Sequence, residues 1–181
     1  MKYLIASDIH GSAFWCDKLL KAFEKEQADK LVLLGDLLYH GPRNPFPDGY
    51  DCPEVYDALN GIKDKIIAVR GNCDSEVDQM VLEFPMMSPI AVLEHKGRTV
   101  FATHGHLYDD KTPPMLQAGD ILLNGHFHVP AIKTLSNGIV YANCGSVGLP
   151  KGGSQNSYIL LDEDLQIKSL STGETLRRFS L

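Results

Sequence analysis

The sequence lacks an excess of positive charge. Its 181 residues include 17 Lys and Arg against 23 Asp and Glu, which gives a formal net charge of −6 at pH 7. The chain therefore has no overall basic field of the kind that attracts nucleic acid, although charge alone leaves a local basic patch open. The composition thus argues against a nucleic-acid partner.

Cysteine is scarce, and its spacing forms no metal-binding or redox motif. The four cysteines are far apart and include no C-x-x-C pair (Cys16, Cys52, Cys73 and Cys144). This spacing argues against a structural zinc site and against a redox-active pair. We expect reduced thiols, as in a cytoplasmic protein.

Long apolar runs are also missing. The N-terminus has only a brief apolar run before Asp8, which is too short for a signal peptide, and no stretch elsewhere is long enough to span a bilayer. We therefore expect a cytoplasmic location and no membrane partner. The chain contains no internal repeat, low-complexity tract or linker, so we expect a single domain over residues 1–181.

Hydrophobic patterning predicts alternating strands and helices in the first half of the chain. Ser12 is placed to cap a helix, and apolar residues at helical spacing follow it. Ser75, followed three residues later by Asp78, resembles a capping box at the start of another helix. This β-α-β order favours parallel neighbouring strands. The expected strands are 3–7, 30–34 and 65–69, and further helices are expected at 53–62 and 75–84.

Strands predominate after Pro85, where we expect more antiparallel pairing. Helical signal is weak there, apart from a short stretch at 113–117. The pattern as a whole predicts an α/β (α+β) fold in which two sheets pack face to face and are flanked by helices. The expected strands of this half are 90–94, 99–103, 121–124, 132–135, 139–142, 158–161 and 165–170.

Short islands of Asp, His and Asn follow five of these expected strands. Because ligands bind beyond the carboxyl ends of strands in α/β sheets, the islands predict one shared site. Their nitrogen and oxygen donors suit first-row divalent metal ions. A single such His or Gly-Asp is more often a surface residue or a turn, so the prediction depends on the whole set. The islands are Asp8-Ile9-His10, Gly35-Asp36, Gly71-Asn72-Cys73-Asp74, Thr103-His104-Gly105-His106 and Gly125-His126-Phe127-His128.

Two of the islands contain donors that are two residues apart. Asp8 and His10 have this spacing, and so do His126 and His128. In an extended chain such residues point to the same side. Each pair is therefore able to reach one metal, or each member can serve a different metal.

The order of the motifs, D-x-H, G-D, G-N-x-D, G-H and G-H-x-H, resembles that of the calcineurin-like metallophosphoesterase superfamily. The strings 40–44 (HGPRN) and 69–78 (VRGNCDSEVD) resemble the small bacterial phosphodiesterases of the YfcE type. The similarity extends over nearly the whole chain. It implies a four-layer metallophosphoesterase fold, a two-sheet β-sandwich flanked by helices.

The resemblance also implies two divalent metal ions and a small phosphodiester substrate, hydrolysed by a hydroxide that bridges the ions. It favours Mn²⁺, while the donor types also admit Zn²⁺, Fe and Ni²⁺. Asp36 and Asn72 then belong to the catalytic centre. The implied ligands of the first ion are Asp8, His10, Asp36 and His128. Those of the second ion are Asp36, Asn72, His104 and His126.

One position departs from the family pattern. Cys73 stands where many members have a His that protonates the leaving group, and a thiol is a poor substitute. We therefore expect aryl esters to react faster than alkyl esters.

His106 is the candidate replacement acid, and Arg70 and Arg43 are candidates to hold substrate oxygens. Alternatively, His106 orients a ligand, Arg70 pairs with Asp74, and Arg43 stabilises its loop. Asp74 itself is expected to orient a metal ligand.

Two other functions are compatible with the resemblance. One is a nuclease of the superfamily, but such nucleases usually keep the His that Cys73 replaces. The other is a non-catalytic scaffold that resembles the retromer subunit, but a scaffold needs no complete set of metal ligands. Both are therefore weaker interpretations than a phosphodiesterase. The Pro-rich segment 39–53 is either a lid or a subunit contact, so a homo-oligomer stays open.

Overall fold

The computed structural model describes all 181 residues, which form two sheets packed face to face. This arrangement confirms the expected two-sheet sandwich. The six-stranded sheet contains, in spatial order, β11 (Thr175–Ser180), β10 (Asp164–Ser169), β9 (Ser157–Leu161), β1 (Tyr3–Ala6), β2 (Lys30–Leu33) and β3 (Ile66–Ala68). The five-stranded sheet contains β4 (Ile90–His95), β5 (Arg98–Thr103), β6 (Ile121–Asn124), β8 (Val140–Asn143) and β7 (Ala131–Thr134).

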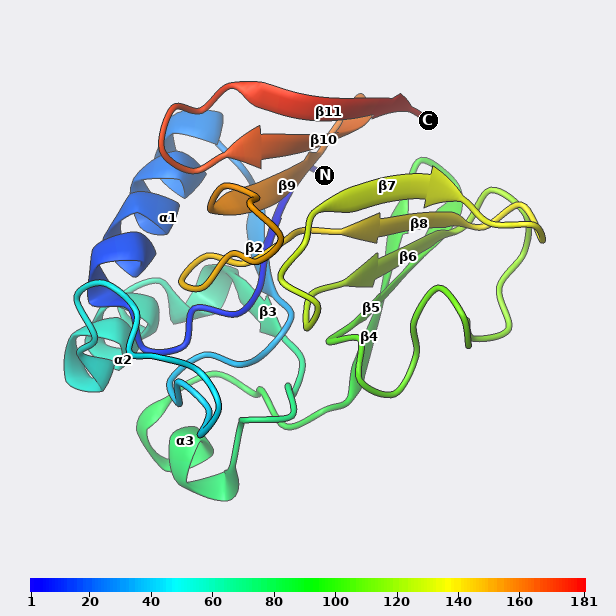
Figure 1. The fold of residues 1–181 in the computed structure, drawn as a ribbon. Coiled ribbons are helices and arrows are strands. Elements are labelled where there is room, and N and C mark those ends of the chain that lie inside the picture. Colours follow the sequence, from blue (N-terminus) through cyan, green and yellow to red (C-terminus); the bar gives the residue numbers. More distant parts are fainter.

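The α-helices are α1 (Ala13–Glu26), α2 (Cys52–Asn60) and α3 (Glu76–Val81). Figure 1 shows α1 and α2 on the side of the six-stranded sheet that faces away from the other sheet. The expected caps are present, because Ser12 accepts a hydrogen bond from the main-chain N–H of Trp15 and Ser75 forms a capping box with Asp78. No helix is both long enough and apolar enough to cross a membrane.

The outer face of the five-stranded sheet is covered by a loop instead of a helix. Leu116, in the segment 104–120, packs against a cluster that includes Phe101 and Leu122. The helix expected at 113–117 does not form. Five residues are too few for a stable helix, and Asp120 instead accepts a hydrogen bond from the main-chain N–H of Gln117 across a turn (2.9 Å).

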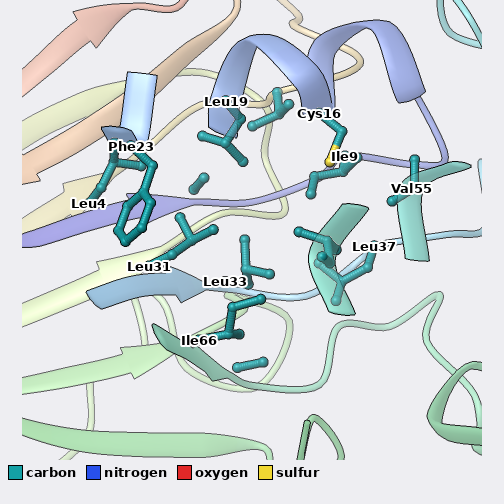
Figure 2. Packing of buried hydrophobic residues seen from close by; sticks show 14 of the residues in the cluster. Leu4, Ile9, Cys16, Leu19, Phe23, Leu31, Leu33, Leu37, Val55 and Ile66 are labelled. Atoms are coloured by element: carbon teal, nitrogen blue, oxygen red, sulfur yellow. The ribbon is translucent and has the colours of Figure 1, made fainter. Parts of the chain in front are cut away.

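Residues of the central strands alternate between two hydrophobic cores, as the pleat requires. Ile5 and Val32 point between the sheets and pack in the same cluster as Leu123 of the second sheet. Leu4, Leu31 and Leu33 point to the other face, where Figure 2 shows them beneath the side chains of α1 and α2. The six-stranded sheet is therefore anchored on both faces.

Parallel pairing brings the expected strand ends to the site. β1, β2 and β3 are parallel neighbours, as the β-α-β order predicts. The strands after Pro85 pair mostly antiparallel, as expected: β9, β10 and β11 do so in the first sheet, and β4 and β7 do so at the edges of the second. The central strands β5, β6 and β8 of the second sheet are nevertheless parallel. Each sheet thus contributes a set of carboxyl strand ends, and the polar islands follow those ends.

The two-core arrangement makes a testable prediction about stability. Leu161 of β9 is fully buried between the sheets, whereas Leu176 of β11 is 38% exposed. We expect Leu161→Ala to lower the free energy of unfolding by about 2–5 kcal/mol, because it leaves a cavity. Leu176→Ala, the matched control, should change it by less than about 0.5 kcal/mol. Urea titration of both variants measures the difference, and equal stabilities would contradict the packing.

Candidate metal centre

The ends of β1 and β6 bring one carboxylate and two imidazoles together. Oδ1 of Asp8 lies 3.5 Å from Nε2 of His10 and 3.2 Å from Nε2 of His128. The two Nε2 atoms are 3.4 Å apart. All three side chains are buried. They form the first of two contiguous groups of donors.

The second group is arranged around Asp36, at the end of β2. Oδ2 of Asp36 lies 3.7 Å from Nε2 of His10 and 3.4 Å from Nε2 of His104. Nε2 of His104 is in turn 3.0 Å from Oδ1 of Asn72 and 3.2 Å from Nδ1 of His126. Asp36 therefore lies between the two groups. The structure brings together all seven side chains that were predicted as metal ligands.

Three of the histidines are held in one orientation. His10, His104 and His128 each have Nδ1 within hydrogen-bonding distance of a main-chain carbonyl oxygen. A carbonyl oxygen only accepts, so Nδ1 is the donor, and in the neutral imidazole the Nε2 lone pair points into the site. The acceptors are, in the same order, Tyr39 (2.7 Å), Leu34 (2.7 Å) and Leu149.

This arrangement fits bound metal cations. Oδ1 of Asp8 is buried and has no hydrogen-bond donor. It faces the Nε2 atoms of His10 and His128, which carry lone pairs in the orientation described above. Converging buried lone pairs with no proton between them are unfavourable unless a cation lies among them. The mixed nitrogen and oxygen donors suit a first-row divalent ion.

The titration of these groups follows from their burial and their charges. Burial opposes ionisation of Asp8, but the contacts with His10 and His128 outweigh it and hold the pKa of Asp8 well below its usual range. Burial opposes protonation of His104, yet the hydrogen bond to Asp36 and the charges of Asp8 and Asp36 raise its pKa to about 9. Without metal, protons on imidazole would neutralise the carboxylates. Cations and protons therefore compete for the same nitrogen atoms.

The backbone at the site is left-handed at five of these residues. The φ angles are 59° for Asp8, 52° for His10, 55° for Asp36, 63° for His126 and 60° for His128. Such a conformation costs roughly 1–2 kcal/mol for a residue with a side chain. The reasoning that paired donors align in an extended chain was therefore wrong. Left-handed turns bring Asp8 and His10 together, while His126 and His128 point into different groups.

Asp74 supports the segment that carries Asp36. Its carboxylate accepts hydrogen bonds from the main-chain N–H groups of Asp36 (2.8 Å), Leu37 (2.9 Å) and Gly71 (2.7 Å). It lies behind the site and contacts the backbone, not a ligand side chain. Arg70 does contact Asp74, as its alternative role implied, but through the main chain and not through the carboxylate. Nε of Arg70 donates to the main-chain oxygen of Asp74 (3.2 Å).

Two clefts adjoin the donors, and Asn72 lines both. The first has a volume of about 570 Å³, and its lining includes Tyr39, Arg43 and Lys151. Lys151 was not predicted, because only a Gly-rich segment marks its place in the sequence. The second cleft has a volume of about 420 Å³, and its lining includes Arg70, His106, Met87 and Leu107.

Cys73 and His106 differ in how readily they release a proton. Burial and the negative charge of Asp36 raise the pKa of the Cys73 thiol to about 12, so the thiol holds its proton tightly. Burial and the positive charge of His104 lower the pKa of His106. The His106 ring centroid lies 5.4 Å from that of His104 and 6.2 Å from that of His126. His106 is therefore adjacent to the donors and open to the second cleft.

Comparison with known proteins identifies the family. The calcineurin-like phosphoesterase superfamily domain matches residues 1–166. Phosphodiesterase YfcE of Escherichia coli (strain K12) is 46% identical over 165 residues, which cover 91% of this chain and 89% of that protein. The solved structure of YfcE, a phosphoesterase from E. coli, superposes with a TM-score of 0.96 at 42% identity and covers 99% of both chains. The chain belongs to the calcineurin-like phosphoesterase superfamily.

A more distant likeness concerns the fold alone. The Vps29 protein of Entamoeba histolytica, crystallised in complex with Zn²⁺, superposes with a TM-score of 0.58 at 18% identity and covers 99% of both chains. The same sandwich therefore occurs in a protein with a largely different sequence.

The close packing around Asp8 makes a prediction about metal binding. A Cβ atom at Gly125 would lie 2.0 Å from Oγ of Ser7 and 2.6 Å from Oδ2 of Asp8. We therefore expect Gly125→Ala to displace the Asp8 carboxylate and to lower the number of metal ions bound per chain. Elemental analysis after dialysis against Mn²⁺ measures that number, and thermal unfolding reports the accompanying loss of stability.

Gly61→Ala is the matched control, because the nearest atom to its Cβ would be 3.3 Å away, at the end of α2. It should bind metal as the unaltered protein does. Equal metal content in the two variants would show that Asp8 does not need its present position.

Proposed function

We propose that this chain is a metal-dependent phosphodiesterase that hydrolyses a small phosphodiester with two divalent metal ions bound. The observation that supports this most directly is the contiguous set of donors that shares Asp36, five of which are buried. In this proposal the first ion is held by Asp8, His10, Asp36 and His128. The second ion is held by Asp36, Asn72, His104 and His126.

The charge of the proposed centre suits a phosphodiester. Two divalent ions would supply a hydroxide nucleophile and withdraw charge from the phosphoryl oxygens. Their four positive charges, less three from Asp8, Asp36 and hydroxide, leave one positive charge for a monoanionic diester. Neutral Asn72 provides an oxygen donor without cancelling that charge. Mn²⁺ is the ion we propose, on the basis of the family resemblance.

The second cleft is the proposed place of the leaving group. His106 opens into it beside His104 and His126, and Arg70 lines the same cleft. We assign Arg70 to a phosphoryl oxygen, since a guanidinium pairs well with phosphate. His106 is the proposed donor of a proton to the departing oxygen. The segment 39–53 contributes Tyr39 and Arg43 to the wall of the other cleft, which supports a role at the site for this segment.

The activity itself is the first prediction from this proposal. Metal-stripped protein reloaded with Mn²⁺ should hydrolyse bis(p-nitrophenyl) phosphate in preference to p-nitrophenyl phosphate, because the centre carries charge for a monoanion. Asp36→Asn removes the shared carboxylate, so it should abolish turnover and lower the bound metal to at most one ion per chain.

Asp17→Asn is a suitable control for this variant, because Asp17 is an exposed residue of α1 that pairs only with Lys21. It should retain both metal and activity. Full turnover by a folded Asp36→Asn protein with two bound ions would overturn the assignment.

The role of His106 is tested by varying the leaving group. General acid catalysis contributes typically ~10²–10⁴-fold, and an alkoxide needs it far more than a p-nitrophenolate does. We therefore expect His106→Gln to lower kcat on an alkyl diester by at least about 10-fold and to change kcat on bis(p-nitrophenyl) phosphate only slightly. A uniform loss on both esters would indicate that His106 orients a ligand instead.

A further inference from the structure

The first cleft contains two cationic side chains that no carboxylate neutralises. Arg43 and Lys151 both line it, and neither takes part in any salt bridge of the structure. The one carboxylate among the lining residues is Asp36, which belongs to the proposed metal centre. Two unneutralised cations in one cleft are notable in a chain whose net charge is −6.

Hydrogen bonds hold the main chain in place at or next to both cationic residues. The main-chain N–H of Lys151 donates to the carbonyl oxygen of His128 (3.0 Å), directly beside the proposed centre. Arg43 lies in a turn closed by Asn44, whose main-chain N–H donates to Gly41 (3.2 Å) and whose side chain donates to the carbonyl oxygen of His40 (2.9 Å).

The segment that carries Arg43 is fixed in turn to the region after His10. The His40 ring packs against Phe46, with ring centroids 4.4 Å apart. The main-chain N–H of Ala13 donates to the carbonyl oxygen of Gly49 (2.8 Å). These contacts hold the loop that carries Arg43 in place, so the position of Arg43 relative to the proposed metal centre is defined.

The second cleft has a different chemistry. Its arginine, Arg70, already donates to the main-chain oxygen of Asp74 and lies 3.7 Å from Oε1 of Glu76. Met87, Pro89 and Leu107 supply apolar surface there. Because Asn72 lines both clefts, a phosphodiester held at the centre has room for one ester arm in each cleft. The two arms then meet different surroundings, one cationic and one largely apolar.

We propose that the natural substrate carries a second anionic group, a phosphate or a carboxylate, on the arm that occupies the first cleft, where Arg43 and Lys151 bind it. This inference rests on the proposed function. With two divalent ions bound, the centre would already provide the single positive charge that a monoanionic diester needs, so two further cations complement a further anion.

The position of the anionic arm determines the products. Hydrolysis forms a bond from hydroxide oxygen to phosphorus and breaks the bond from phosphorus to the oxygen of the other arm. That oxygen leaves through the second cleft and takes up a proton. The product that remains is a phosphomonoester that still carries the second anionic group.

Matched substrates test the inference. Thymidine 5′-(p-nitrophenyl phosphate) and its 3′-phosphorylated form share one leaving group and differ by one phosphate. The p-nitrophenyl phosphodiesters of glycolate and of ethylene glycol are the corresponding pair for a carboxylate. With Mn²⁺ bound, we expect kcat/KM to favour the anionic member of at least one pair by about 10-fold, the scale of a charge-assisted contact. The pair that shows the preference identifies the anionic group.

The variants Arg43→Gln and Lys151→Gln should each lower that preference by roughly 5- to 10-fold, because each removes one charge from the cleft. Lys111→Gln and Arg177→Gln are the controls, since each removes one positive charge from an exposed residue outside both clefts. They should retain the preference. An equal loss on both members of a pair in Arg43→Gln would mean that this arginine holds the transferred phosphoryl group, which overturns the inference.

A binding measurement separates this inference from the proposed activity. Calorimetry with Mn²⁺-loaded protein should show that thymidine 3′,5′-bisphosphate binds about 10-fold more tightly than thymidine 5′-monophosphate, and that Arg43→Gln removes the difference. Hydrolysis of bis(p-nitrophenyl) phosphate with no preference in either substrate pair or in binding would overturn the inference and leave the proposed function standing. Tighter bisphosphate binding through Arg43 with no diester hydrolysed would overturn the proposed function and support the anion site.

Discussion

The burial of two carboxylates within a group of imidazoles is the constraint on which the rest of this structure depends. Asp8 and Asp36 are nearly inaccessible to water, and the exposed fraction of each is at most 2%. Burying ionised carboxylates is costly unless positive charge accompanies them. The three histidines whose Nδ1 atoms donate to carbonyl oxygens cannot supply that charge while they are neutral. Bound cations satisfy the carboxylates and the imidazole lone pairs together, so site and fold are stabilised by the same event.

The sandwich defines the distances within this centre. Asp8 and Asp36 follow strands of one sheet, while His104 and His126 follow strands of the other. The core between the sheets therefore sets how closely the two sets of donors approach. Glycine makes the final approach possible, because a Cβ atom at Gly71 would lie 2.1 Å from Oδ1 of Asp36. The strained left-handed backbone at the ligands persists because this packing and the surrounding hydrogen bonds hold it in place.

Much of the fold was predictable because its signals are local. Strand hydrophobicity followed by polar residues identified the strand ends, and Ser12 and Ser75 identified helix starts. The rest depended on tertiary contacts. β11 was not predicted, because Thr175–Ser180 is largely exposed and has no apolar pattern. The relative positions of His126 and His128 came from left-handed turns that spacing does not reveal. Lys151 joins the first cleft only because the chain folds back against His128.

The distribution of charge bears on the size of the substrate. The chain as a whole is negative, yet the first cleft presents Arg43 and Lys151 beside a centre that would carry positive charge. Attraction between exposed charges is screened beyond about 8 Å at physiological ionic strength. A small anion that enters the cleft is therefore attracted by the nearby cations, and the net charge of the distant surface hardly affects it. A long polyanion would place most of its phosphates outside the range of the two cations, on a chain whose net charge is −6. The arrangement thus favours a compact phosphodiester over a nucleic-acid strand, on electrostatic grounds that do not depend on the family resemblance.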